Sequence, residues 1–187
     1  IGSNGLTSAR HDVLSHYSKG KYPESYDNDL PSELAYCGSK NLTDKLEGLN
    51  IDIGKMLLSP TRSYAPLLKL IFDEIGRNKI NGIIHCTGGG QTKILHFIDN
   101  LHLLKNNLFE IPPIFKLIMN ESNTDPKEMY KVFNMGHRME IYLDPENASK
   151  VIDISKSVGI DAKIIGEVIE SDVNRLSIQS ELGNFDY

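Results

Sequence analysis

Cysteine, basic charge and long apolar runs are all scarce in this sequence of 187 residues. Only Cys37 and Cys86 are present, far apart in the chain, which argues against a disulfide scaffold and suits a reducing compartment. The formal net charge is −5 and the lysines and arginines are spread singly, so we expect no nucleic-acid partner. No apolar run approaches the roughly 20 residues of a membrane-spanning helix, and no signal-peptide pattern opens the chain. We therefore expect a cytoplasmic protein without a membrane partner.

Length and hydrophobic content suit one compact fold. A chain of 187 residues with 40% hydrophobic residues can bury a sizeable core, and we expect residues 1–187 to form a single domain. The chain begins with Ile1 and a loop-like run to Gly5, as though it started inside a longer protein. We therefore expect the sequence to be a fragment.

The most informative stretch runs from Ile83 to Gly90, where apolar residues lead to His85, Thr87 and three consecutive glycines. Glycines without Cβ atoms let backbone N–H groups approach an anionic or carbonyl ligand closely. A helix over Thr92–Asn100 would place this turn at the positive end of a helix dipole. The alternative is a tight strand-to-helix turn without a ligand, but His85 and Thr87 favour a site because they supply side-chain donors.

Helical and strand patterns are intermixed along the chain. Helices are expected at Leu6–Ser18, Leu67–Ile75, Thr92–Leu104, 126–134 and 145–158, the last two opened by Asp-Pro pairs and the last closed by Gly159; strands at Ile80–Ile84, Met139–Leu143, Ala162–Val168 and Val173–Ile178. Lys19–Ser39 lacks a period and is expected to be a mobile or function-specific surface excursion. Pro112 and Pro113 are expected to close a connection. Since strict βαβ alternation is missing, we predict an α+β fold with a mixed β-sheet flanked by helices.

Four polar turns lie at element boundaries: Gly2–Gly5, Ser59–Tyr64, His85–Gly90 and Phe133–Gly136. In this order, and together with Met129–Gly136 and Gly159–Val168, they resemble the C-terminal domain of the phosphoribosylformylglycinamidine cyclo-ligase family, also called aminoimidazole ribonucleotide synthetase. The resemblance covers essentially the whole chain, and it implies an alpha/beta/alpha sandwich.

The resemblance also implies an activity. Members of the family convert formylglycinamidine ribonucleotide to aminoimidazole ribonucleotide in de novo purine biosynthesis by an ATP-dependent ring closure. ATP and Mg²⁺ are held mostly by an N-terminal domain, which is also the homodimerisation half and is missing from this chain. The chain is thus expected to be the substrate-side C-terminal domain, with its own N-terminal domain as partner and without activity alone. No metal ligand is assigned to it.

Two side chains are the strongest functional candidates. His85 is the candidate catalytic residue, because an imidazole can polarise an amide or transfer a proton near neutral pH; the alternative is a strand-end histidine satisfied by backbone. Arg62 offers a planar fork for a substrate phosphate or carboxylate; the alternative is a surface salt bridge.

The other candidate substrate-binding residues lie in turns. Ser3, Asn4 and Gly5 form a possible hydroxyl and N–H cradle at the chain start, and Thr87, Gly88, Gly89 and Gly90 form a second. Asn134 is expected either to hold a substrate amide or to cap a helix. Gly136 either belongs to the same site or is a helix C-cap glycine.

The sequence departs from the family pattern at several positions. Gly2 stands where many members have a histidine, and Tyr64-Ala65-Pro66 stands where a lysine is often found. His137 and Arg138 replace small or apolar residues, and we expect both to face solvent. The Lys19–Ser39 excursion is longer than usual. These departures leave two alternatives open: a non-catalytic ligand-binding or regulatory domain of the same fold, and a sister ATP-dependent synthetase.

Overall fold

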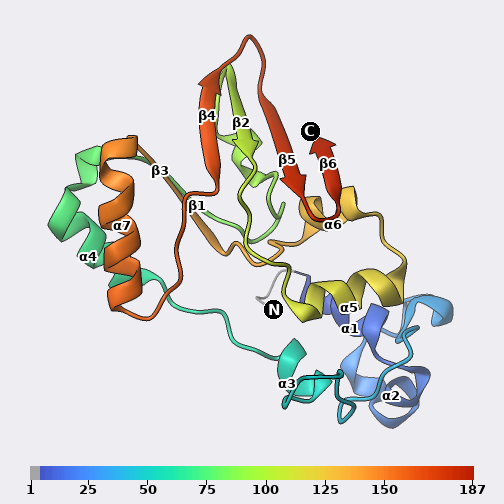
Figure 1. Cartoon of the computed structure of the whole chain (residues 1–187). Helices are drawn as coiled ribbons and strands as arrows, with labels where there is room; N and C mark the ends of the chain where they lie inside the picture. The colour runs from blue at the N-terminus through green and yellow to red at the C-terminus, as the bar shows by residue number, and fades with distance from the viewer. Residues whose placement is uncertain (1–4) are drawn as a thin grey trace. The chain divides into compact units, whose positions relative to one another are not determined.

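A computed structural model describes residues 5–187 of the chain (Figure 1). The chain divides into two compact units. The first consists of Ile1–Thr61, Thr87–Gly90 and Ile111–Met135, and the second of Arg62–Cys86, Gln91–Glu110 and Gly136–Tyr187. The glycine turn is therefore a four-residue excursion of the chain out of the second unit into the first. No helix among residues 5–187 is long and apolar enough to span a membrane.

The first unit is helical. Its elements are α1 (Leu6–Val13), α2 (His16–Lys21), α3 (Ile53–Leu57), α5 (Pro113–Ser122) and α6 (Pro126–Val132), with 3-10 turns η1 (Pro23–Ser25) and η2 (Ser32–Leu34). Helix α5 buries Ile114, Phe115, Leu117 and Ile118, which recur at helical spacing, and it packs on α1. Helix α6 begins at a proline, and the Asp125 carboxylate accepts a hydrogen bond from the N–H of Lys127 at 2.8 Å.

The second unit contains all the strands. Its elements are α4 (Ala65–Ile75), η3 (Arg77–Lys79), β1 (Ile80–His85), η4 (Lys93–His96), β2 (Leu101–Lys105), β3 (Met139–Leu143), α7 (Pro145–Ser157), β4 (Gly166–Glu170), β5 (Arg175–Ser180) and β6 (Gly183–Asp186). Strands β1 and β3 form an antiparallel pair. The other four form a mixed sheet in the order β4-β2-β5-β6, in which only β2 and β5 run parallel.

Helices α4 and α7 lie side by side (Figure 1). Leu67, Ile71, Val151 and Ile154 are buried between them, and partly buried residues of β1 and β3 pack against this core. Gly159 ends α7 as predicted: its φ is +70°, its N–H bonds the carbonyl of Lys156, and the next N–H bonds the carbonyl of Ser155. This pair of bonds is the Schellman motif.

The α+β class is confirmed, and so are the helices predicted near 126–134 and 145–158 and the strand Met139–Leu143. The strands fall into two sheets, of which the larger is mixed. That residues 1–187 form one substrate-side domain remains a prediction.

The predicted helix over Thr92–Leu104 is wrong. A single 3-10 turn, η4, is followed by a break at Asn100, where φ is +55°, and then by β2. Strand β2 pairs with β4 and β5, residues more than 60 positions later in the chain, so long-range pairing outweighs the local apolar spacing. Since no α-helix directly follows the glycine turn, the turn does not lie at the positive end of a helix dipole.

Three further boundaries differ from expectation. The predicted helix Leu6–Ser18 breaks at Leu14, whose extended backbone pairs with Lys40, so α1 and α2 are separate. The predicted strand Ala162–Val168 begins only at Gly166. The prolines at 112 and 113 open α5 instead of closing a connection, because proline at the first helical position lacks an N–H that would have no partner there in any case.

The Lys19–Ser39 excursion is built around one buried aromatic side chain. Tyr36 is 3% exposed; its N–H donates to Nδ1 of His11 at 3.2 Å, and its ring lies 4.8 Å from the His11 ring and 5.7 Å from that of Tyr26. Burial lowers the pKa of His11, which keeps the imidazole neutral and able to accept this bond.

Candidate functional site

Phe133 is the point where residues of three predicted turns come close together within the first unit. Gly5 and Gly90 belong to two of these turns, and Phe133 begins the third. Gly5 is the N-cap of α1 with φ of +80°, and a Cβ there would stand 2.5 Å from the Phe133 ring. A Cβ on Gly90 would stand 2.6 Å from the carbonyl oxygens of both Phe133 and Tyr130. Both positions thus require glycine for close approach as well as for backbone conformation. Asn134 follows Phe133 directly.

The glycine turn has a left-handed backbone throughout. The φ angles of Gly88, Gly89 and Gly90 are +27°, +85° and +49°, values that L-residues with side chains seldom adopt. Gly88 is exposed, Gly89 is half-buried and Gly90 is buried. The exposed end of the turn therefore lies next to Thr87, which is itself half-buried.

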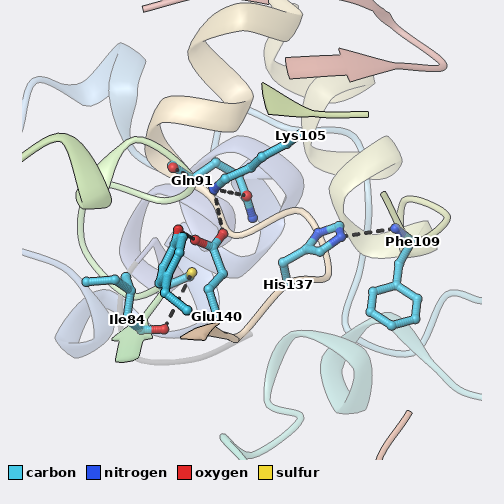
Figure 2. A network of polar contacts seen from close by, with 8 residues as sticks. Ile84, Gln91, Lys105, Phe109, His137 and Glu140 are labelled. Atoms are coloured by element: carbon cyan, nitrogen blue, oxygen red, sulfur yellow. Dashed lines mark hydrogen bonds and ion pairs between the residues drawn. The ribbon is translucent and has the colours of Figure 1, made fainter. Parts of the chain in front are cut away.

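Cys86 and Gln91, on either side of this turn, are both buried in the second unit, and Gln91 is bonded to a buried ion pair (Figure 2). Lys105 Nζ lies 2.5 Å from Glu140 Oε1, and each side chain is 3% exposed. The same ammonium donates to the side-chain oxygen of Gln91 at 2.9 Å and to its backbone carbonyl at 3.1 Å. The other carboxylate oxygen of Glu140 accepts from the Tyr142 hydroxyl at 2.5 Å. These contacts join β2, β3 and the residue that follows Gly90.

Cys86, on the opposite stem, is 2% exposed, and its thiol donates to the carbonyl of Ile84 at 3.9 Å. Burial and the negative charge of Glu140 raise the pKa of its thiol, and the same two causes raise the pKa of the Tyr142 hydroxyl. The thiol stays protonated near neutral pH. Cys86 therefore belongs to the support of the turn and does not supply a nucleophile.

His85 ends β1 and is exposed. The Tyr64 ring stands edge-on to its imidazole, with 6.1 Å between centroids, and Lys93 donates to its backbone carbonyl at 3.1 Å. Among residues 5–187 no backbone group bonds the imidazole, unlike in the alternative considered from the sequence. Tyr64 brings the end of the predicted Ser59–Tyr64 turn to His85, within the second unit.

Arg62 is exposed, and its guanidinium donates to the carbonyl of Gly159 at 3.1 Å. Among residues 5–187 this carbonyl is the one acceptor of an Arg62 hydrogen bond, and no carboxylate of those residues pairs with the guanidinium. The surface salt bridge considered as the alternative is absent from the described residues. Since a guanidinium carries five N–H donors, one bond to Gly159 leaves donors for an anion.

Neither Asn134 nor Gly136 caps a helix. Helix α6 ends at Val132 with Phe133 as its C-cap, and the chain then turns at Met135, which is 1% exposed with φ of +50°. Both capping alternatives are therefore wrong. Asn134 is half-buried beside Phe133.

The expectation that His137 faces solvent is also wrong. His137 is 4% exposed, and its Nε2 accepts a hydrogen bond from the N–H of Phe109 at 3.0 Å (Figure 2). The two rings lie 5.3 Å apart. His137 thus fixes the segment after β2.

Ser3 and Asn4 lie outside the described residues, and convergence of the whole predicted set stays a prediction.

Sequence reasoning missed Gln91, Lys105 and Glu140. A usable signal was present: Lys105 and Glu140 are opposite charges within otherwise apolar stretches, and buried charges require partners.

Comparison with known proteins identifies the relatives. The sequence matches the family profile described as AIR synthase related protein, C-terminal domain, over residues 38–179. The chain belongs to this family. The matched range contains Arg62, His85, the glycine turn and Asn134 of the AIR synthase related C-terminal domain.

Individual relatives agree. The phosphoribosylformylglycinamidine cyclo-ligase of Methanococcus vannielii is 35% identical over 168 residues, covering 90% of this chain and 41% of that protein. That of Methanopyrus kandleri is 33% identical over 172 residues, covering 91% and 41%. The solved structure of E. coli HypE, a hydrogenase maturation protein, has a TM-score of 0.47 and 18% identity, covering 94% of this chain and 44% of that one. The chain spans about two fifths of the length of the first two relatives.

Among residues 5–187 no group of three or more His, Cys, Asp or Glu side chains is placed to hold a metal ion.

Proposed function

We propose that this chain is the substrate-side C-terminal part of an ATP-dependent cyclo-ligase that converts formylglycinamidine ribonucleotide to aminoimidazole ribonucleotide in purine biosynthesis. ATP and Mg²⁺ are held mainly by an N-terminal domain of the kind the family carries, which also forms the homodimer. In this reaction ATP phosphorylates the formyl oxygen, a nearby nitrogen of the substrate attacks the activated carbon, and phosphate leaves.

The observation that carries the proposal is the meeting of Gly5, Gly90 and Phe133. Two glycines more than 80 positions apart lie so close to one residue that neither position accommodates a Cβ. Tight approach of this kind supports the proposal that Gly5 and the Thr87–Gly90 turn belong to one site in the first unit, which also contains Asn134. Thr87, Gly88 and Gly89 then contribute a hydroxyl and backbone N–H groups to the substrate site, and Ser3, Asn4 and Gly136 are retained as proposed substrate contacts.

Arg62 and His85 have separate roles in the proposal. Arg62 binds the substrate phosphate, because its exposed guanidinium has donors beyond its bond to Gly159. His85 polarises the amide or transfers the proton of the attacking nitrogen, because its imidazole is exposed at the strand end, beside Tyr64.

One observation favours a second candidate. Gly2 replaces the histidine that the family pattern carries before the Ser-Asn-Gly run, and a binding domain without chemistry would tolerate that loss. A non-catalytic ligand-binding domain of the same fold remains the second candidate.

Isothermal titration of this chain with formylglycinamidine ribonucleotide tests the proposal. We expect saturable binding of one molecule per chain, with ribose 5-phosphate binding more weakly because it shares only the phosphate contact. A folded chain that shows no binding heat at millimolar substrate would contradict the substrate role. Ribose 5-phosphate binding as tightly as the substrate would favour a general anion-binding domain.

A further inference from the structure

The residue that follows the glycine turn, Gln91, is bonded to the Lys105–Glu140 ion pair, and the residue that precedes the turn, Cys86, is buried near the same pair. On the far side of Gly90, Lys105 donates two hydrogen bonds to Gln91, one of them to the backbone carbonyl. On the near side, the thiol of Cys86 lies close enough to Glu140 for that charge to raise its pKa. Cys86 and Gln91 are 2% and 1% exposed. The turn thus leaves the second unit and returns to it at one buried point.

Among the described residues, four lysines of the second unit donate to backbone carbonyls, but Lys105 differs from the other three. Lys93 bonds His85, Lys150 bonds Glu74 and Lys163 bonds Leu108, and none of these ammonium groups is fully buried. Lys105 is 3% exposed and has a carboxylate and two oxygens of Gln91 as partners, so its position is fixed by three bonds. A buried ion pair costs desolvation and is weak evidence for stability by itself.

A bond to a backbone carbonyl constrains the chain in a way that a side-chain bond does not. The Gln91 carbonyl is held next to Gly90, whose φ is +49° and where a Cβ would stand 2.6 Å from the carbonyl oxygens of Phe133 and Tyr130. Three successive glycines have many accessible conformations, and a flexible turn pays an ordering cost when it binds. A fixed stem on each side reduces that cost.

From these contacts we infer that Lys105 is a positioning residue: through Gln91 it holds the Thr87–Gly90 turn in its binding conformation without touching the substrate. The two oxygens of Gln91 fix the position of the Lys105 ammonium, Glu140 neutralises its buried charge, and Tyr142 satisfies the second oxygen of that carboxylate. The substrate named in this inference rests on the proposed function. The effect of Lys105 on the order of the turn does not depend on that function.

A matched pair of variants separates the effect of Lys105 on the conformation of the turn from its effect on the stability of the fold. Glu140→Gln removes the carboxylate but leaves Lys105 able to donate to Gln91. The double variant Lys105→Met with Glu140→Gln also removes the donor, and it leaves no buried charge unpaired. Comparing the two isolates the bonds from Lys105 to Gln91. Lys163→Met is the control, because it removes another lysine-to-carbonyl bond in the same unit, at a segment remote in sequence from the turn.

The first readout is the backbone order of Gly88, Gly89 and Gly90 by ¹⁵N relaxation in the chain without ligand. We expect order parameters near ~0.85 in the unchanged chain, Glu140→Gln and Lys163→Met, and below ~0.6 in the double variant. The second readout is affinity for formylglycinamidine ribonucleotide, which should fall at least tenfold in the double variant and less than threefold in the other two.

Unchanged turn order and unchanged affinity in a folded double variant would overturn the inference. If the unchanged chain does not bind the substrate, the proposed function fails, and turn order alone decides the role of Lys105. If the double variant does not fold, Gln91→Met replaces it, because it keeps the ion pair and removes one of the two acceptors. Turn order must then fall to an intermediate value, and an unchanged value would again overturn the inference.

Discussion

The carbonyl oxygen of Phe133 lies 2.6 Å from the point where a Cβ on Gly90 would stand. Since a carbonyl of this backbone cannot retreat as the end of a flexible side chain can, any side chain at position 90 must displace the turn or the C-terminal end of α6. Gly90 also has φ of +49°, so its substitution meets two separate penalties.

Gly90→Ala is therefore expected to be clearly more destabilising than Gly48→Ala in the same unit. Gly48 also has a positive φ of +77°, but open space surrounds its Cβ position. The control should lose about 1–2 kcal/mol of unfolding free energy for conformation alone, and Gly90→Ala at least ~2 kcal/mol more. Urea denaturation of both variants measures the difference. Equal losses would show that the approach to Phe133 carries no cost.

Arg62→Lys is expected to weaken substrate binding more than it weakens the fold. Lysine keeps the charge and can reach a carbonyl, but it loses the fork that binds a phosphate through two parallel bonds. A lost charge-assisted hydrogen bond of roughly 1.5–3 kcal/mol corresponds to about one to two orders of magnitude in affinity. Arg175→Lys, at an exposed position of β5, is the control. Affinity within a factor of two at fixed ionic strength, with a melting temperature several degrees lower, would make Arg62 structural.

Lys105→Met alone should destabilise the chain by about 3–5 kcal/mol, because Glu140 then remains buried without its cation. Adding Glu140→Gln should recover most of that loss, because a neutral amide costs less to bury. A double-mutant cycle measured by chemical denaturation gives the coupling. Additive losses would mean that the two charges do not act as a pair.

Cys86 should resist thiol reagents in the folded chain while the exposed Cys37 reacts. The pKa of Cys86 is raised by burial, so folding favours the neutral thiol. This contribution to stability is present below the unfolded pKa of about 8.5 and is lost as the pH rises above it. One thiol should react at pH 8 in native buffer and two in denaturant, and Cys86→Ala should flatten the alkaline loss of stability. Two fast-reacting thiols in native buffer would contradict this assignment.

Local signals predicted much of the fold. Proline at the first position and Gly159 at the end defined α7, because both act within one helical turn. The same rules failed for β2, where apolar residues at helical spacing lie just before a strand that depends on partners far along the chain. They also failed for α5, because proline starts a helix as readily as it ends one.

The candidate site was predicted only where its chemistry is local. The glycine turn was found because three glycines in a row are visible in the sequence. Arg62 and His85 were found because each lies in or beside a polar turn of the sequence. The Lys105–Glu140 pair joins residues 35 positions apart through two strands that belong to different sheets. One strand was predicted as a helix, so its charged residue had no predicted neighbour.

The central claim is that this chain completes a cyclo-ligase. In the test, this chain is joined in frame to the N-terminal part of the Methanococcus vannielii relative, in place of that protein's own C-terminal part. The ATP-dependent formation of aminoimidazole ribonucleotide by the joined protein is then measured. We expect turnover from the joined protein, at least a hundredfold less with His85→Ala, and none from the 187 residues alone. A joined protein that folds and binds ATP but forms no product, or turnover by the chain alone, would contradict the account.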